Sequence, residues 1–448
     1  LKDEYKPILL ITAAFFAALY LPVTSPRFMG ALLESLSLLR WYAREHVVLC
    51  LIPAFYIAGA ITIFFSQNGV MKYLGASANK IVAYGVASVS GTLLAVCSCT
   101  VLPLFAGIYR LGAGIGPATA FLYSGPAINA LAIILTARVL GVGLGVARTI
   151  GAVLFSVVIG LVMELVFGDE EAKRKRPAEL KGSEGHGALK SVALLVGTMM
   201  ALLIFANWAN PGDKSGFFAA IYRYKWFLTA GAAALFAFTA RHLLKLSWYK
   251  LGLAALPPAL LALLVPSHPI VSFGVGTVTL ALLLQNGKDE AEEWLDASWG
   301  FARQIFPLLL AGILVAGFLL GSAHGGGIVP TSWIAGLVGG NSIFANFFAS
   351  ITGAFMYFAT LTEVPILEGL MNNGMGKGPA LALLLAGPAL SLPNMLVIKS
   401  VMGWKRTALF ITLVVALSTV TGPRRSRRRR GSHPPPRRAD RPGYSVRS

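Results

Sequence analysis

The sequence predicts an all-α bundle of membrane-spanning helices, with two pseudo-symmetric four-span repeats that contain broken or re-entrant helices. Three observations lead to this fold class: a low content of charge, long apolar segments, and an internal repeat rich in Gly and Pro. Of the 448 residues, 56% are hydrophobic and 13% are charged, against about 25% charged residues in ordinary soluble domains. So few charges cannot cover a globular surface of this size, so we expect the lipid bilayer to cover much of it.

Apolar segments of spanning length occur along the chain. A helix needs about 20 mostly apolar residues to cross the hydrocarbon, and residues 47–65, 149–167 and 191–209 come to that length. With shorter apolar segments included, the expected total is roughly 11 to 13 spans. Residues 26–45 carry three Arg residues and are expected to lie in the membrane interface.

Positive charge is concentrated in two stretches. The formal net charge of +19 would suggest a nucleic-acid partner for a soluble protein. Here much of it lies in the Arg- and Pro-rich residues 424–448, which we expect to be disordered and to attract anionic lipid headgroups. No nucleic-acid partner is expected. The positive-inside rule predicts that this tail and the basic residues 173–176 are both cytoplasmic.

An internal repeat covers the two halves of the chain. The segment that starts at Gly91 aligns without a gap with the segment that starts at Gly353, an offset of 353 − 91 = 262 residues. Shared apolar composition would not align so many Gly and Pro residues. The matched positions include Pro103 with Pro365, Gly116-Pro117-Ala118 with Gly378-Pro379-Ala380, and Gly125-Pro126-Ala127 with Gly387-Pro388-Ala389.

The repeat divides the chain into five parts. They are an N-terminal helix and interfacial segment (1–45), a first transmembrane repeat (46–168), a cytoplasmic loop with a central transmembrane insert (169–298), a second transmembrane repeat (299–422), and a disordered tail (423–448). If both copies begin and end in the cytoplasm, they are parallel repeats about an axis along the membrane normal. Inverted copies, which place the Arg tail outside, are the alternative.

Prolines interrupt both copies at corresponding positions. Proline has no backbone N–H to donate, so it frees a carbonyl at membrane depth. Such backbone is tolerated only where it faces protein or a water-filled cavity. Gly/Pro breaks at matching places in two halves therefore indicate a transport site, and ordinary proline kinks are the structural alternative.

Two thiols precede the first proline. Cys97 and Cys99 flank Ser98, and a thiolate pair with this spacing can bind a soft metal or metalloid such as Cu(I), Zn(II) or trivalent arsenic. The alternative is that they pack as small hydrophobic side chains. The spacing is neither a Cys-x-x-Cys redox motif nor a closed zinc set, so we treat any such ion as cargo and expect no cofactor.

Glu363 lies in the apolar residues 356–367 of the second copy. An ionisable residue at membrane depth is costly and suggests a function, here as a proton carrier; a carboxyl that is hydrogen-bonded between helices is the alternative. Together with the thiols, we expect it to line one central cavity. The other expected lining residues are Ser98, Thr100, Ser124, Gly125, Pro126, Asn129, Thr360, Thr362, Gly387, Pro388 and Asn394.

At these motifs a family resemblance becomes specific. CSCTVLPLFAGIYRLGAGIGPATAFLYSGPAINALAI resembles the signature of the predicted permease family that includes the organoarsenical efflux permeases. TEVPILEGLMNNGMGKGPALALLLAGPALSLPN is similar to that family's second half. The resemblance implies an efflux permease of a bacterial or archaeal inner membrane, with Cys97 and Cys99 as substrate-binding thiols. Arsenical-exporting members carry Gly after Cys-Ser-Cys, where this chain has Thr100, so the substrate is open within the family.

Three other functions compete with efflux of a thiophilic substrate. One is transport of a different small solute. Another is a thiol-based membrane oxidoreductase, which would need a redox partner or cofactor site that the sequence does not show. A passive channel is the third, and it would not need the acidic Glu363. ATP coupling is not supported, because Gly376-Lys377-Gly378 lacks the Ser or Thr and the upstream Gly of a P-loop.

Overall fold

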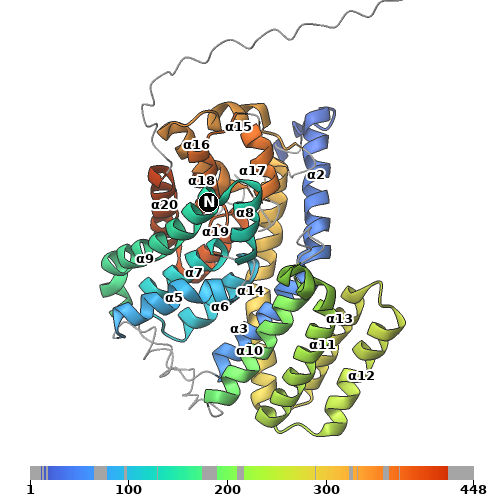
Figure 1. Ribbon diagram of the computed structural model, residues 1–448. Helices are drawn as coiled ribbons and strands as arrows, with labels where there is room; N and C mark the ends of the chain where they lie inside the picture. Colours follow the sequence, from blue (N-terminus) through green and yellow to red (C-terminus); the bar gives the residue numbers. More distant parts are fainter. Residues whose placement is uncertain are drawn as a thin grey trace, which may run out of the picture.

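The computed structural model shows a helical bundle (Figure 1). It describes residues 12, 15–16, 19–64, 78–94, 98–128, 130–173, 189–208, 216–287, 289–321, 326–329, 331–356, 363–372 and 374–421. Within these ranges the regular structure is helical, and β pairing is limited to isolated bridges such as Gly339 with Met375. The predicted all-α fold class is confirmed.

The helices follow one another along the chain with short connections. They are α2 (Pro26–Tyr42), the π-helical segment η1 (Ala43–Leu51), α3 (Ile52–Phe64), α5 (Lys80–Leu94), α6 (Ser98–Arg110), α7 (Ile115–Ala127), α8 (Ala130–Val139), α9 (Val142–Lys173), α10 (Leu189–Ala206), α11 (Phe217–Leu244), α12 (Trp248–Leu264), α13 (Pro269–Gln285), α14 (Asp289–Leu320), α15 (Thr331–Val338), α16 (Ile343–Phe355), α17 (Glu363–Asn372), α18 (Lys377–Ala386), α19 (Leu392–Met402) and α20 (Trp404–Thr421).

Several of these helices are long and apolar enough to cross a membrane. In the described part of the chain five pass on length and composition: Pro26–Phe64, Val142–Glu170, Phe217–Leu244, Glu290–Leu320 and Trp404–Thr421. A sixth span results if α7 and α8 are joined across their 47° bend. The remaining apolar helices, such as α12 and α13, are shorter, so the expected 11 to 13 spans include segments that do not meet this criterion.

The N-terminal segment belongs to a long helical run. Residues 26–45, which are expected to lie in the interface, continue through α2, η1 and α3 as one run of 39 residues that packs along α14 (Figure 1). The reason is a stripe of buried residues at helical spacing, Ala31, Ser35, Leu38 and Tyr42. The Ser35 hydroxyl donates to the Leu314 carbonyl of α14 at 2.7 Å.

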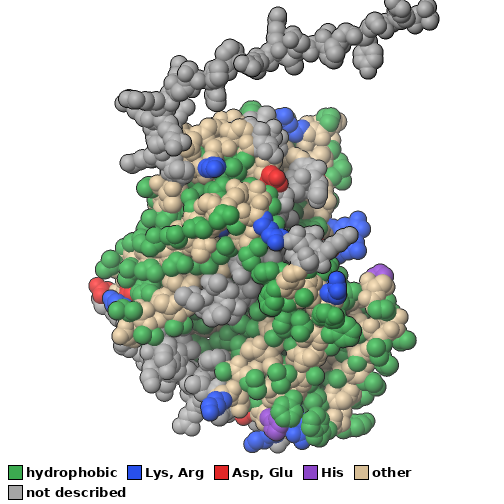
Figure 2. Space-filling view, in the orientation of Figure 1, with side chains coloured by type: hydrophobic (Ala, Val, Ile, Leu, Met, Phe, Trp, Pro, Cys, Tyr) green, Lys and Arg blue, Asp and Glu red, His purple; other side chains and the backbone are tan. Residues whose placement is uncertain are grey.

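The outer surface is unusually apolar. Large hydrophobic side chains are exposed along α9, α11 and α12, among them Leu165, Phe227 and Leu263. Figure 2 shows hydrophobic side chains over most of the visible face, with few charged ones between them. Soluble monomers rarely expose such large apolar areas. The described surface is therefore that of an integral membrane protein.

The helix breaks predicted at the two Gly-Pro positions are present, whereas Pro103 lies inside the continuous helix α6. α7 ends at Ala127 and α8 begins at Ala130 with a sharp bend, directly after Gly125-Pro126. In the second half, α18 ends at Ala386, and Gly387-Pro388 lie in the turn before α19. Helices α10 to α13, which make up the central insert, lie in the lower part of Figure 1, where α10 packs on α3 and α13 packs on α14.

The directions of α9 and α20 do not fit one topological expectation. Arg406, in the first turn of α20, lies 3.7 Å from Glu170 near the end of α9. Thr421, at the other end of α20, lines a groove together with Leu140 and Leu144, where α9 begins. The two helices are thus antiparallel, and Lys173 and Thr421 lie at opposite ends of the bundle. This direction does not fit the prediction, made from charge alone, that the basic residues 173–176 and the Arg tail share one side of the membrane. Residues 174–176 and the tail themselves lie outside the described residues.

Candidate functional site

A pair of opposite charges lies inside the bundle. Arg148 of α9 and Glu363, the first residue of α17, are both fully buried, with Nη1 of the Arg 2.5 Å from Oε1 of the Glu. Removing two such charges from water costs several kcal/mol per ion, and ionisable groups at membrane depth are as a rule functional. The burial of Glu363 agrees with the sequence expectation. This pair joins the first half of the chain to the second.

Arg148 also ties the ion pair to a helix break. Its Nε donates to the Ala127 carbonyl at 3.3 Å, and Nη1 donates to the Thr136 hydroxyl at 3.0 Å. Ala127 is the last residue of α7, so its carbonyl has no partner within that helix. Arg148 therefore caps the broken end of α7 and holds α8 beside it. Nη2 has no hydrogen-bond partner among the described residues.

Buried polar side chains of α7 hold the neighbouring helices in place. The Tyr123 hydroxyl donates to the Leu385 carbonyl of α18 at 3.0 Å, and the Ser124 hydroxyl donates to the Ala87 carbonyl of α5 at 2.8 Å. Gly125 allows α6 to approach closely, because a Cβ at this position would lie 2.6 Å from the Val101 side chain. The first broken helix is thus fixed to both halves.

Part of the predicted site is buried inside the bundle. Ser124, Gly125 and Pro126 are buried at the end of α7, close in sequence to the carbonyl that Arg148 caps. Thr100 is buried in α6. In the second half Gly387, Pro388 and Asn394 are buried around the turn between α18 and α19.

The thiols remain a prediction. Ser98 and Cys99 are placed only by their backbone, at the start of α6, and Cys97, Asn129, Thr360 and Thr362 lie outside the described residues. Among the residues that are described, no three His, Cys, Asp or Glu side chains gather into a metal site. The expected meeting of Cys97, Cys99 and Glu363 in one cavity is therefore untested.

Arg148 is the residue that sequence reasoning missed. The predicted span began at Thr149, which placed Arg148 at the edge of the membrane. The apolar residues from Leu144 to Phe155 surround it on both sides, so the reasoning that identified Glu363 applies to Arg148 as well. The helix in fact begins at Val142.

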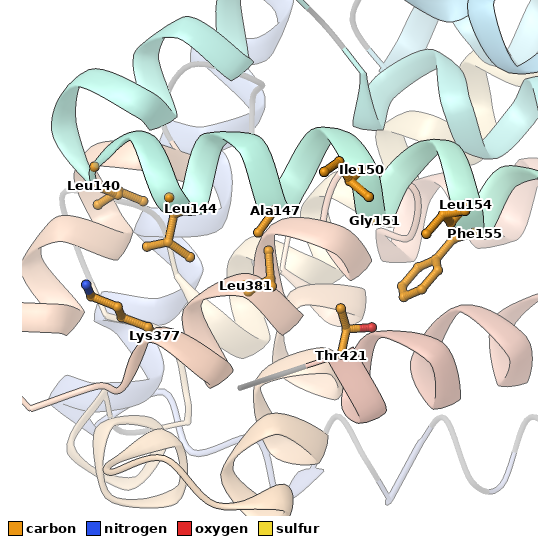
Figure 3. Close-up of a pocket in the computed structure, with 12 residues that line it drawn as sticks. Leu140, Leu144, Ala147, Ile150, Gly151, Leu154, Phe155, Lys377, Leu381 and Thr421 are labelled. Carbon is orange, nitrogen blue, oxygen red and sulfur yellow. The ribbon is translucent and has the colours of Figure 1, made fainter. Parts of the chain in front are cut away.

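A groove between α9, α18 and α20 lies apart from the charged pair. Its volume is about 450 Å³, and Figure 3 shows its apolar lining, with Leu381 and Ile150 among the labelled side chains and Lys377 at one end. Neither Arg148 nor any residue predicted for the site lines it. The charged pair, which joins the broken helices, is therefore the stronger candidate for the functional site.

Together, the apolar helical bundle, the matched breaks and the buried charges are features of a membrane transporter. The model of a family described as "Predicted permease" matches residues 32–423, and the chain belongs to this family. This confirms the family that the sequence motifs suggested.

Two relatives are both described as UPF0718 proteins. MJ0584 of Methanocaldococcus jannaschii is 41% identical over 382 residues, which cover 85% of this chain and 92% of the relative. YraQ of Escherichia coli is 31% identical over 136 residues, 28% of this chain and 34% of the relative. No solved structure matches. These names specify neither an activity nor a substrate, so the transporter class rests on the family model.

Proposed function

We propose that this permease is a secondary exporter of the inner membrane that moves a small thiophilic substrate, such as a trivalent organoarsenical or a soft metal ion, in exchange for protons. Membership of the permease family supports transport. The thiols Cys97 and Cys99 support a thiophilic cargo, because sulfur ligands favour soft centres. The observation that carries the proposal is the buried pair of Arg148 and Glu363.

The pair supports proton coupling through its position. When Glu363 takes up a proton, the attraction between the two side chains loses its ionic part, and Arg148 keeps only its bonds to Ala127 and Thr136. Glu363 begins α17, a helix that packs on α8 and α18. Proton uptake thus weakens a contact between the two halves, and this is what a coupled exporter needs.

The test is substrate-driven proton movement in reconstituted vesicles. Trivalent methylarsenite added to one side is expected to move protons in the opposite direction with the wild-type protein. Glu363→Gln should abolish the dependence of transport on the pH gradient. The control is Glu164→Gln, since Glu164 is a partly exposed carboxylate held by Tyr84 at 2.6 Å and Lys80 at 3.2 Å. Equal loss in both variants would contradict the role of Glu363.

The thiols are tested separately. Cys97→Ser and Cys99→Ser are expected to abolish export of methylarsenite while the protein level stays normal. Full export by the double variant would show that the thiols pack as hydrophobic side chains and would remove the thiophilic part of the proposal. A screen with Cu, Zn and Sb, and with solutes that do not bind thiols, then identifies the cargo.

A further inference from the structure

Corresponding helices of the two halves begin at the same offset as the sequence repeat. α7, α8 and α9 begin at Ile115, Ala130 and Val142, and α18, α19 and α20 begin at Lys377, Leu392 and Trp404. Each helix of the second set begins 262 residues after its counterpart in the first. The repeat in the amino-acid sequence is thus matched by the positions at which the helices begin. The relative orientation of the two copies follows from their contacts.

One contact joins a residue to its own counterpart. The Tyr123 hydroxyl donates to the carbonyl of Leu385, and these positions are separated by 262 residues. A contact between equivalent positions is expected only close to a two-fold axis, where exchanging the copies maps the contact onto itself. Contacts between helices show the same exchange, because α6 packs on α19 while α8 packs on α17.

The long helices give the direction of the axis. The 39-residue run of α2, η1 and α3 corresponds by the offset to α14, and both are long enough to cross the membrane. Phe28 contacts Phe318 with ring centroids 5.5 Å apart, whereas the Trp294 indole donates to the Tyr56 carbonyl at 2.8 Å. Residue numbers rise along one helix as they fall along the other, so the counterparts are antiparallel.

The shorter helices agree with this direction. Lys80 at the start of α5 pairs with Glu164, and Tyr109 near the end of α6 binds Arg406, so both contacts lie at the Lys173 end of α9. In the other half, the Asn346 side chain near the start of α16 donates to the carbonyl of Thr419 at 3.2 Å, at the opposite end of the bundle. The Gly340 amide donates to the Gly374 carbonyl, just beyond α17.

We infer that the two halves are inverted repeats, related by a pseudo-two-fold axis that lies in the plane of the membrane and passes close to Tyr123 and Leu385. A two-fold axis that relates antiparallel spanning helices must be perpendicular to them. This replaces the parallel arrangement expected from charge. It also means that α5 and α6 approach the middle of the bundle from one membrane face, and α16 and α17 approach it from the other.

The experiment labels equivalent residues from the two sides of the membrane. Val142 and Trp404 are counterparts, 70% and 66% exposed, and Ile81 and Ile343 are a second pair of counterparts, 85% and 53% exposed. Each is changed singly to Cys in a chain with Ser at the three native Cys positions. A membrane-impermeant maleimide is applied to right-side-out and to inverted vesicles.

Inverted repeats predict that Val142→Cys and Ile343→Cys react from one side, and that Trp404→Cys and Ile81→Cys react from the other. Reaction of both members of a pair from the same side overturns the inference. Because a chain without its native thiols is at risk of poor insertion, a crosslink in the wild-type background gives a second measurement. The pair Phe28→Cys and Phe318→Cys should join, and the pair Phe28→Cys and Glu290→Cys, which parallel copies would bring together, should not. The reverse result overturns the inference as well.

Discussion

The two halves of this permease differ most where they are expected to be alike. By the 262-residue offset, the counterpart of Glu363 is Val101 and the counterpart of Arg148 is Phe410, and all four side chains are buried. Arg148 and Glu363 form an ion pair, whereas their counterparts Phe410 and Val101 are apolar. Val101 and Phe410 show that corresponding positions can be filled by apolar side chains, so the fold does not require an ion pair there. Replacement of a buried ion pair by apolar residues is often neutral or stabilising, which favours a functional reason for keeping it.

The largest effect is expected from breaking the pair on one side. Arg148→Ala leaves the Glu363 carboxylate buried without its partner and removes the cap from Ala127. Loss of one partner of a buried pair destabilises a protein by about 3–5 kcal/mol. Thermal unfolding of the purified protein in detergent should show a large decrease in midpoint. An unchanged midpoint would mean that the pair is accessible to water.

The comparison becomes sharper when the two charged side chains are replaced by the apolar residues found at their counterpart positions. The double variant Arg148→Phe with Glu363→Val should unfold at a much higher temperature than Arg148→Ala, because it leaves no unpaired charge and loses only the cap on Ala127 and the bond to Thr136. It should also lose transport that depends on the pH gradient. If the double variant still exports substrate in a pH-dependent way, the charges serve stability alone.

A smaller effect is expected where α14 meets α19 in the second half. A Cβ at Gly312 would lie 2.5 Å from the Pro393 Cα, whereas nothing lies within 4 Å of a Cβ at Gly300 of the same helix. Gly312→Ala should lower the stability by about 1–3 kcal/mol through overpacking. Gly300→Ala should be neutral or stabilising by up to about 1 kcal/mol. The first half has Cys50 at the position that corresponds to Gly312, so this close contact is a feature of one half. Equal unfolding midpoints for the two variants would show that α14 can move away from α19.

The smallest effect is expected from the tail. Truncation after Gly422 should leave expression and transport unchanged, because the Arg- and Pro-rich residues cannot form an apolar core. Binding of the purified protein to vesicles that contain anionic lipid should weaken, since clustered Arg attracts such headgroups. Loss of expression on truncation would contradict this.

The sequence predicted the elements that depend on local chemistry. The Gly-Pro positions predicted the breaks after α7 and α18, because proline removes a backbone hydrogen bond of a helix and glycine lowers its stability. The apolar neighbours of Glu363 predicted its burial. The offset of the repeat predicted which helices correspond.

The parts that were missed depend on contacts between distant segments. The period of apolar residues reports that a helix has a buried face, but it does not report the direction of the helix on the other side of the contact. The orientation of the repeats was therefore taken from charge, and the contact of Arg406 with Glu170 does not fit that choice, because it places the start of α20 at the end of α9. Arg148 was missed because the predicted span began at Thr149. Its pairing with Glu363 could not be predicted, because the two residues are 215 positions apart and no local pattern joins them.

The π-helical segment η1 has a consequence for how the molecule bends. In η1 the backbone bonds reach five residues back, as from the Ile52 amide to the Val47 carbonyl, and such segments are weak points in a helix. Residues 305–313 of α14 correspond to η1 by the offset, and they contain Pro307, which removes one backbone bond. These two antiparallel helices thus each depart from regular α-helical bonding at corresponding residues. A bend at these residues would leave the packing at both ends of each helix in place.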